Sequence, residues 1–524
     1  MRALRPRHAR GTLSASRAST HPGATLPPPA VADAPSSSPG CAAAPRMMRG
    51  RRASRAALAA LLALGAACAG PAVDASSSAV RVWLTTGDRA TLLARQPDVA
   101  LTRAPPPTPA TIVVDERTRY QAMVGFGAAL TDASAWLIQT RMTGAQREAL
   151  LQELFGRSGD GLGLGFVRVT MGASDFSRSH YSYDDLPPGE TDPTLARFSI
   201  APDRAEKLPV LRRALAINPR LTVMATPWSA PAWMKSGGTL IGGTLRPEAY
   251  GPFALYFRRF IEAYAAEGVP VHYLSVQNEP HHEAADYPAM RLDPAARARF
   301  VGEHLGPLLA SAGLETRILD WDHNWDQPAS PLAVLADPVA RRYVAGVAWH
   351  CYAGEVSAQS VVHDAYPRTD TFFTECSGGG WAPDFGDNLT WNVRTLIIGA
   401  TRHWARGVLL WNLALDERGG PHLGGCDDCR GVVTIDAASG AVVRNVEYYA
   451  LGHVSRFVRP GAHRIASTTD VQGLESVAFR NADGVKALVV LNAATAARTF
   501  AVRTDGRGWR HTLPAGSVAT FVWR

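Results

Sequence analysis

Eight short apolar runs, separated by longer amphipathic stretches, constrain the fold of this chain more than any other feature. The runs have the length and composition of buried strands, and segments between them, such as 251–267 and 294–312, carry apolar residues at helical spacing. The runs span residues 124–130, 165–171, 221–226, 272–277, 317–320, 344–351, 371–374 and 408–413. This alternation predicts an α/β fold, a (β/α)8 TIM barrel, whose active site lies at the carboxyl ends of the strands.

Two glutamates follow strand-like runs, and their positions suggest a pair of catalytic carboxylates. Glu279 comes after the fourth run and Glu375 after the seventh, 96 residues later. The carboxyl ends of barrel strands meet at one face, so the two side chains can meet there. Glycosidases need such a pair, because one carboxyl group protonates the leaving oxygen while the other attacks the anomeric carbon. We expect the acid to have a raised pKa, since two nearby carboxylates repel each other.

The amino-terminal region carries the whole net positive charge of the chain. Residues 1–80 contain ten arginines and two aspartates, which accounts for the formal charge of +8, so residues 81–524 balance. The balance removes the electrostatic argument for a nucleic-acid partner. Residues 1–46 are predicted to be a disordered or non-native extension, and 47–69 a signal peptide with an apolar core too short to span a bilayer. The residues that lead to Cys68 resemble a bacterial lipoprotein cleavage site. We therefore expect export, followed either by lipid anchoring at Cys68 or by free release to the periplasm or the medium.

The remaining cysteines give different expectations. Cys426 and Cys429 have the spacing of a zinc ligand pair, but no second pair accompanies them, so a local disulfide is favoured in an exported protein. Cys351 and Cys376 adjoin strand ends, and we expect both to be small buried apolar side chains. No phosphate loop, dinucleotide fingerprint or metal-ligand set is present in the sequence, so we expect no cofactor and no metal.

The end of the chain changes character and predicts a second domain. After about residue 449, short alternating runs are separated by Gly, Asn and Asp turns, as in an antiparallel β-domain. Strand-like segments at 80–84 and 111–114 are expected to complete the same sandwich. We therefore divide the chain into strands of the sandwich at 80–117, a catalytic barrel at 118–445 and the rest of the β-sandwich at 446–524.

Several ordered motifs resemble those of glycoside hydrolase family 30, the glucosylceramidase-like family. The resemblance covers about residue 111 to the carboxyl end. It is carried by Gly-Phe-Gly-Ala-Ala-Leu-Thr-Asp at 125–132, Ser-Asp-Phe-Ser at 174–177, Thr-Pro-Trp-Ser-Ala-Pro-Ala-Trp-Met-Lys at 226–235, Gln-Asn-Glu-Pro at 277–280, Thr-Glu-Cys at 374–376 and Trp-Asn-Leu-Ala-Leu at 411–415. It implies a retaining β-glycosidase with Glu279 as acid/base and Glu375 as nucleophile.

The resemblance also implies roles in sugar binding. Asn278 would form a hydrogen bond with the sugar 2-hydroxyl, and Asp132 and Trp228 would hold the other hydroxyls. Tyr352 would contact the nucleophile, and Trp411 would form the floor of the subsite. Where lysosomal glucosylceramidases have an asparagine after Gly-Gly-Pro, this chain has His422, which predicts a different aglycone side. Asp175 is a weaker candidate, because a strand-end aspartate often caps a helix.

These expectations lead to an exported hydrolase of β-D-glucosidic bonds that acts by double displacement. A β-glucan or glucosyl-oligosaccharide and a glucosylceramide are both compatible with the motifs, as are endo and exo cleavage. A β-xylosidase of the same family is a further alternative. A surface protein that binds carbohydrate on a barrel without turnover is the alternative from another class. Both glutamates argue against that last reading, since an inactive barrel usually lacks one of them.

Overall fold

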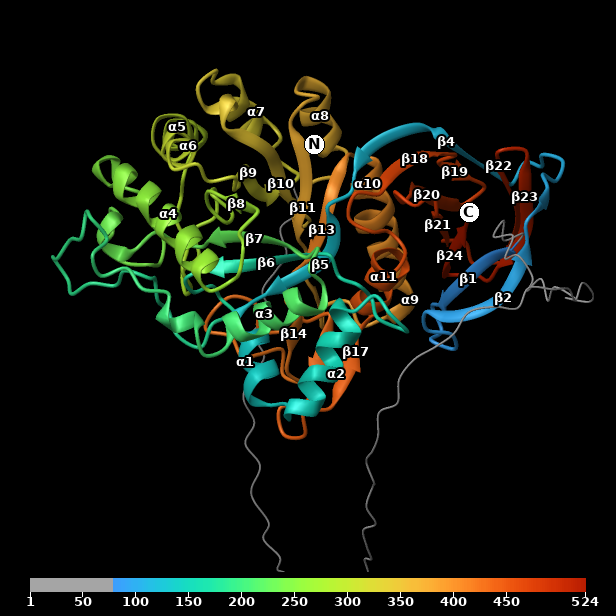
Figure 1. Ribbon diagram of the computed structural model, residues 1–524, viewed down its shortest axis with the longest axis horizontal. Coiled ribbons are helices and arrows are strands. Elements are labelled where there is room, and N and C mark those ends of the chain that lie inside the picture. Colours follow the sequence, from blue (N-terminus) through green and yellow to red (C-terminus); the bar gives the residue numbers. More distant parts are fainter. Residues whose placement is uncertain (1–78) are drawn as a thin grey trace, which may run out of the picture. The chain divides into compact units, whose positions relative to one another are not determined.

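The computed structural model describes residues 79–524, and the predicted leader, with Cys68, lies outside the described residues. A closed parallel barrel has its eight strands in chain order, which confirms the predicted (β/α)8 architecture (Figure 1). The barrel strands are β5 (Gly125–Leu130), β6 (Phe166–Met171), β7 (Thr222–Pro227), β8 (Tyr273–Ser275), β9 (Arg317–Asn324), β10 (Val344–His350), β11 (Asp370–Glu375) and β13 (Ala405–Leu410). The fourth strand is shorter than the predicted 272–277, because the chain leaves the ladder after Ser275 and turns toward the barrel mouth.

Helices cover the outside of the barrel, as the amphipathic stretches predict. The predicted helix at 294–312 contains one π-helical segment, η4 (Phe300–Leu305), between two short α-helices. The helices are α1 (Asp132–Thr140), α2 (Gly144–Phe155), α3 (Lys207–Ile217), α4 (Tyr250–Ala266), α5 (Pro294–Arg299), α6 (Gly306–Ser311), α7 (Ala329–Ala336), α8 (Ala358–Ala365), α9 (Phe385–Trp391), η6 (Asn392–Gly399), α10 (Ala400–Arg402) and α11 (Val446–Ser455). None of the helices in residues 79–524 has the length and apolar content needed to cross a membrane.

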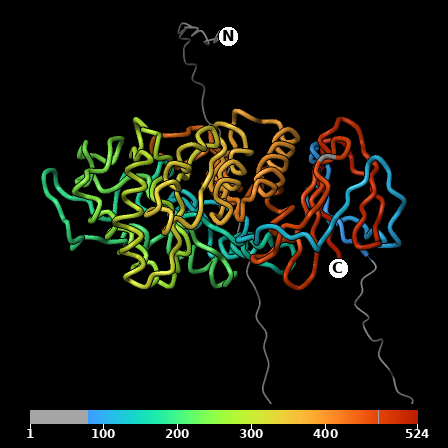
Figure 2. Tube along the Cα trace, turned by 90° about the horizontal axis from the view of Figure 1, so that it is seen from above, coloured from blue at the N-terminus to red at the C-terminus, as the bar shows by residue number. Residues whose placement is uncertain are grey.

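The second domain combines strands from both ends of the described chain. In Figures 1 and 2 the blue amino-terminal strands lie among the red carboxyl-terminal strands. The sheet contains β1 (Ala79–Thr86), β2 (Ala94–Ala100), β3 (Thr102–Arg103), β4 (Thr111–Ala122), β18 (His463–Ser467), β19 (Asp470–Val471), β20 (Leu474–Arg480), β21 (Lys486–Asn492), β22 (Arg498–Thr504), β23 (Arg507–Leu513) and β24 (Ser517–Trp523). Strand β1 pairs with β24, and β4 lies between β18 and β22. The prediction that amino-terminal strands complete this domain is therefore confirmed.

A buried histidine on α11 connects the two domains. The ring of His453 forms hydrogen bonds with the hydroxyl of Thr520, at 2.9 Å, and with that of Thr85, at 2.8 Å. Burial lowers the pKa of His453 to about 3, so the ring is neutral in the folded protein. Because Thr85 and Thr520 belong to β1 and β24, one side chain joins α11 to both ends of the described chain.

Alternation along the strands explains how the fold prepares a site. Val124, Phe166, Met224, Tyr273, Leu319, Ala348, Phe372 and Leu409 form one apolar cluster that fills the barrel. Side chains two residues further along a strand point to the same face, one layer closer to the carboxyl end. At six of those eight places the chain has Arg168, Thr226, Ser275, His350, Thr374 and Trp411, and Phe126 and Trp321 occupy the other two. The layer above the apolar plug is thus mostly polar, and it forms the floor of the barrel mouth.

Candidate active site

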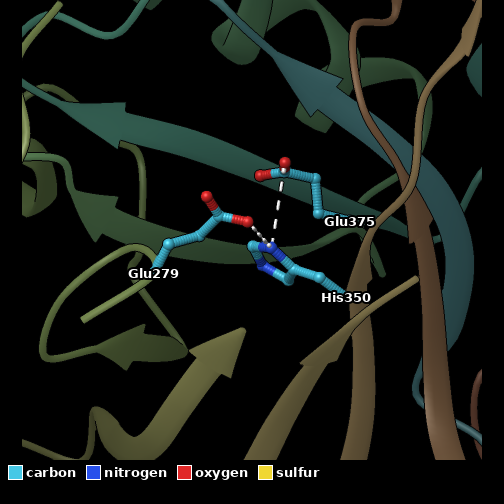
Figure 3. Close-up of side chains that lie close together, drawn as sticks. All are labelled: Glu279, His350 and Glu375. Carbon is cyan, nitrogen blue, oxygen red and sulfur yellow. Dashed lines mark hydrogen bonds and ion pairs between the residues drawn. The ribbon is translucent and has the colours of Figure 1, made fainter. Parts of the chain in front are cut away.

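Glu279 and Glu375 face the same space at the barrel mouth. Glu375 is the last residue of β11, and Glu279 follows β8 with a backbone φ of 46°. One carboxylate oxygen of each lies within 4.8 Å of the other and of a ring nitrogen of His350. Figure 3 shows the ring of His350 facing the carboxylates of both glutamates. A pair of carboxyl groups about 5 Å apart is the spacing of retaining glycosidases, whereas inverting enzymes keep them at roughly 6.5–9.5 Å.

His350 joins both glutamates to a third, deeply buried carboxylate. Its Nδ1 lies 3.0 Å from Oε1 of Glu279 and 3.8 Å from Oε1 of Glu375. Its Nε2 lies 3.0 Å from Oδ1 of Asp322, whose side chain is completely buried. Burial lowers the pKa of His350, but the charge of Glu375 and the bonds to Asp322 and Glu279 outweigh it and raise the pKa to about 9. The ring is therefore an imidazolium at neutral pH.

The pKa of Glu279 is lowered, whereas the sequence predicts a raised pKa for this residue. Burial raises the pKa of Glu279, but the hydrogen bond and the charge of His350 outweigh burial and leave that pKa below its ordinary value. The proton nearest to Glu279 therefore sits on Nδ1 of His350 in the substrate-free protein. Two groups this close titrate as a pair, so the Glu279–His350 unit carries one shared proton.

Arg168 fixes the second side of the site from the middle of β6. Its guanidinium donates to Oε2 of Glu375, to Oδ1 of Asn278 at 2.7 Å and to Oδ2 of Asp322 at 2.8 Å. Arg168 is fully buried, so these bonds operate in a low-dielectric environment. They orient the carboxylate of Glu375, and they turn the amide nitrogen of Asn278 away from the arginine.

A bulge in β9 brings Asp322 into this network. Alternation from Leu319 would turn Asp322 away from the barrel interior. However, Trp321 and Asp322 have φ values of 75° and 54°, and the pairing with β10 skips Asp322. A bulge of this kind redirects one side chain and is common beside active sites. Asp322 therefore accepts hydrogen bonds from Arg168, Ser275, Thr226, Thr374 and His350.

The predicted aromatic residues lie beside the glutamates. The rings of Trp228 and Trp411 stack 5.1 Å apart, and each is only 3% exposed. Arg168 lies over Trp228, with 4.8 Å from the guanidinium carbon to the ring centre. The hydroxyl of Tyr352 donates to Oε1 of Glu375 at 2.9 Å, so Tyr352 contacts that glutamate as expected.

Asp132 has several partners within the protein. Its carboxylate pairs with Lys207 at 2.8 Å and accepts hydrogen bonds from Ser177 and Tyr181. The residue lines a cavity together with Lys207 and Arg178. These contacts hold the carboxylate in place at the start of α1, directly after β5. Its role as a ligand for sugar hydroxyls stays a prediction.

Asp175, which the sequence supports only weakly, lies closer to the glutamates. No helix begins directly after it, so it is not a helix cap. Burial and the negative charge of Glu375 raise its pKa well above the ordinary value. The loop that contains His422 packs over it, since Leu423 donates its N–H to the carbonyl of Asp175 at 2.7 Å. The ring of His422 lies 6.0 Å from that of Phe176.

Both cysteine pairs form disulfides. Cys426 and Cys429 are bonded to each other within the loop. The expectation that Cys351 and Cys376 are small apolar side chains is wrong, because they form a disulfide across 25 residues. Each cysteine follows a barrel strand, β10 or β11, and neighbouring parallel strands bring their carboxyl ends within bonding distance. The disulfide adjoins Tyr352 and Glu375 in the chain.

Two residues of the site escaped the sequence reasoning. Arg168 was visible only as a charged residue inside the apolar run 165–171, where an unpaired charge is costly and a partner is therefore required. Asp322 follows a strand-like run, but nothing local indicates that it turns inward. One oxygen each of Glu279 and Glu375 and a ring nitrogen of His350 lie within 4.8 Å of one another, which is also the spacing of a metal site.

A parallel barrel with two close carboxylates at its mouth defines a glycoside hydrolase of the retaining type. Comparison with known proteins agrees. The model of the glycosyl hydrolase family 30 TIM-barrel domain matches residues 123–458, and that of the family 30 beta sandwich domain matches residues 461–521. The chain belongs to glycosyl hydrolase family 30, and it is a retaining β-glycosidase.

Three relatives illustrate the range of the family. Endo-1,6-beta-D-glucanase from Neurospora crassa is 35% identical over 77% of this chain and 86% of its own length. Lysosomal acid glucosylceramidase from Mus musculus is 30% identical over 79% of this chain and 83% of its own length. The solved structure of the endo-beta1,6-glucanase BT3312 is 33% identical, with a TM-score of 0.78 over 85% of this chain and 99% of that one.

Proposed function

We propose that the protein is an endo-β-1,6-glucanase in which Glu375 is the nucleophile and Glu279 the acid/base. The observation that supports these roles is the pair of carboxylate oxygens within 4.8 Å at the ends of β8 and β11. In the first step, Glu375 attacks the anomeric carbon and the leaving oxygen takes a proton from Glu279, which His350 has supplied. In the second step, Glu279 removes a proton from water, which attacks the same carbon and releases Glu375.

The surrounding residues have distinct roles in this proposal. Asn278 donates its amide N–H to the sugar 2-hydroxyl, because its oxygen is already bonded to Arg168. Trp411 forms the floor under the apolar side of the sugar, and Trp228, which stacks against Trp411, donates its indole N–H to a glycone hydroxyl. Asp132 and Asp175 accept from the remaining glycone hydroxyls, and Asp175 lies close enough to the glutamates for their charges to raise its pKa. The His422 loop covers Asp175 and shapes that end of the pocket.

The substrate assignment depends on the relatives. Endo-1,6-beta-glucanases are similar to this chain both among curated sequences, at 35% identity, and among solved structures, at 33%. Glucosylceramidases are similar at 30–31%, so glucosylceramide is the second candidate. The insertion that carries the Cys426–Cys429 disulfide follows the position where this chain departs from the lysosomal motif, which also favours the glucan. A β-xylosidase and a barrel that binds sugar without turnover remain as outcomes of the test.

The test compares the products that the protein releases from β-1,6-glucan, 4-nitrophenyl β-glucoside, 4-nitrophenyl β-xyloside and glucosylceramide. A ladder of short oligosaccharides from the glucan supports endo action. Glucose from glucosylceramide alone, xylose alone, or binding without products would each refute the proposal. The Glu375→Gln variant should lose at least ~10³-fold in kcat, because it lacks the nucleophile.

A second experiment separates the roles of the two glutamates. In Glu279→Ala, an activated aryl glycoside can still form the glycosyl-enzyme, because its leaving group needs little protonation. Azide needs no base, so it should capture that intermediate and give the β-glycosyl azide. In Glu375→Ala, azide can enter only the vacated space and should give the α-azide. The opposite pattern of products would reverse the assignment.

We also propose that the protein is exported. Two disulfides in residues 79–524 are typical of an oxidising compartment. Mass spectrometry of the amino-terminal peptide from the native host distinguishes a lipid-modified Cys68 from a free new terminus after cleavage. A peptide that retains residues 47–67 would refute the signal peptide.

A further inference from the structure

Exposed aromatic rings gather in one place on this protein. Within residues 79–524, three Phe, Tyr or Trp side chains are strongly exposed, namely Tyr352 at 45%, Trp381 at 56% and Trp391 at 41%. All three line a single cavity of about 530 Å³. That volume lies in the range of small-molecule sites, roughly 300–1,000 Å³. Exposing large apolar rings to water is unfavourable, and three around one hollow indicate a surface that a ligand covers.

The cavity adjoins the catalytic carboxylates. Tyr352 forms part of its wall and donates to Glu375 at 2.9 Å. The Cys351–Cys376 disulfide forms another part, and Cys376 directly follows Glu375. A molecule in the cavity would thus contact Tyr352, whose hydroxyl is bonded to the carboxylate of Glu375. The stacked pair Trp228 and Trp411 lies at the buried end, where each ring is 3% exposed.

The rest of the lining is polar and suits a sugar. Ser377, Asp387, Asn388 and Asn392 complete the wall between the rings. Flat apolar rings combined with hydroxyl, amide and carboxylate groups match a pyranose, which has apolar C–H faces and a rim of hydroxyls. Ser377, Asn388 and Asn392 already donate to backbone carbonyls, so their side-chain oxygens are the groups that can accept from sugar hydroxyls. A lipid chain would offer these oxygens no donor.

We propose that this cavity is a leaving-side subsite. In it, Trp381 and Trp391 bind a glucosyl residue of the glucan segment that Glu279 protonates and that leaves the anomeric carbon. The proposal rests on the proposed function and extends it, because it makes the released segment a recognised part of the substrate. The open, aromatic end receives the chain that leaves, and the buried Trp228–Trp411 end holds the sugar that stays on Glu375.

The support around the two tryptophans is already in place. Gly379 packs against the ring of Trp381, and a Cβ on residue 379 would come 2.0 Å from that ring. The amide nitrogen of Asn388 donates to the carbonyl of Ala382 at 2.6 Å and to that of Asp384 at 2.7 Å, which fixes the loop after Trp381 to α9. Trp391 is the last residue of α9. A preformed platform binds without a further cost of ordering its side chains.

The test measures kcat/KM for a β-1,6-linked glucose oligosaccharide and for 4-nitrophenyl β-glucoside with the full chain. Loss of one stacked ring should lower kcat/KM for the oligosaccharide about 10-fold in Trp381→Ala and in Trp391→Ala. The aryl glucoside should lose much less, since its leaving group does not need the second sugar contact. Trp391→Phe should restore most of the loss, because it keeps a flat apolar ring. Val361→Ala, an exposed residue of α8 outside this cavity, is the matched control and should leave the ratio of the two substrates unchanged.

A second readout is transfer of the glycosyl group to an added glucose oligosaccharide. In this reaction the bond between Glu375 and the anomeric carbon breaks, the acceptor oxygen forms the new bond, and its proton moves to Glu279. The tryptophan variants should transfer less to the acceptor and hydrolyse proportionally more. Gly379→Ala, which displaces Trp381 without removing it, should have the same effect.

The outcomes separate the two proposals. Wild-type protein without activity on β-1,6-glucan overturns the proposed function and this inference with it. This inference alone is overturned if wild type acts on the glucan but the variants keep two wild-type ratios. These are the ratio of kcat/KM for the oligosaccharide to that for the aryl glucoside, and the ratio of transfer to hydrolysis. Equal losses on both substrates, in variants whose thermal unfolding is unchanged, would place the subsite on the glycone side and also overturn it.

Discussion

Replacement of His350 by glutamine tests whether the buried histidine is charged. The ring is fully buried, and its two nitrogens each lie 3.0 Å from a carboxylate oxygen, of Glu279 and of Asp322. The pKa of His350 is raised to about 9, from an ordinary value of about 6.5. Glutamine is similar in size and can still donate one hydrogen bond, but it carries no charge. The substitution therefore removes mainly the ionic contribution.

The magnitude and its pH dependence follow from linkage. A raised pKa in the folded state means that the protonated ring stabilises the fold fully below pH 6.5, and that this stabilisation is lost as the pH rises through about 9. At about 1.4 kcal/mol per pH unit, the difference amounts to about 3 kcal/mol below pH 6.5. We expect His350→Gln to be less stable than wild type by about 2.5 kcal/mol more at pH 7 than at pH 10.

Urea unfolding at pH 7, 8.5 and 10, followed by tryptophan fluorescence, measures this difference. Comparison of the variant with wild type at each pH cancels the titration of the groups that do not interact with His350. His453→Gln is the matched control, because that buried histidine has a pKa of about 3 and is neutral throughout this range. A difference between wild type and His350→Gln that stays constant from pH 7 to pH 10 would refute a charged His350.

Three further experiments test other parts of the structure. Arg168→Met removes the guanidinium from the buried carboxylates of Asp322 and Glu375, so urea unfolding should show a loss of about 3–5 kcal/mol, together with a fall in kcat; an unchanged midpoint would contradict the network. Cys351→Ser combined with Cys376→Ser opens a loop of 25 residues and should cost about 3 kcal/mol. Because the variant keeps the Cys426–Cys429 disulfide, reductant should destabilise wild type by about 3 kcal/mol more than it destabilises the variant, and equal effects would contradict this contribution. Gly127→Ala should destabilise the protein severely, because the added Cβ would lie 1.8 Å from the backbone oxygen of Phe166. Gly251→Ala on α4 meets nothing within 4 Å, so it should be neutral or should stabilise the protein by up to about 1 kcal/mol. Equal melting temperatures for the two variants would disprove this reasoning.

The sequence alone was sufficient for the barrel and for the two glutamates. Buried parallel strands need apolar runs and the covering helices need one apolar face, so both leave a periodic pattern in the chain. The carboxyl ends of barrel strands lie on one face in every such fold, so residues directly after the fourth and seventh runs were expected to meet. The order of the eight strands confirms the fold.

The network around the glutamates was decided only by the tertiary structure. Asp132 is the stronger candidate in the sequence and Asp175 the weaker, but only the structure shows that Lys207 pairs with Asp132 and that the charge of Glu375 acts on Asp175. Asp322 turns inward through a bulge that depends on pairing with β10, and Cys351 meets Cys376 because β10 and β11 are neighbours. Periodicity specifies which face of an element is buried. Contacts between residues of different strands depend on strand order, register and backbone irregularities, which long-range packing determines. The pKa of a group such as Glu279 depends on those contacts, so it also is decided by the tertiary structure.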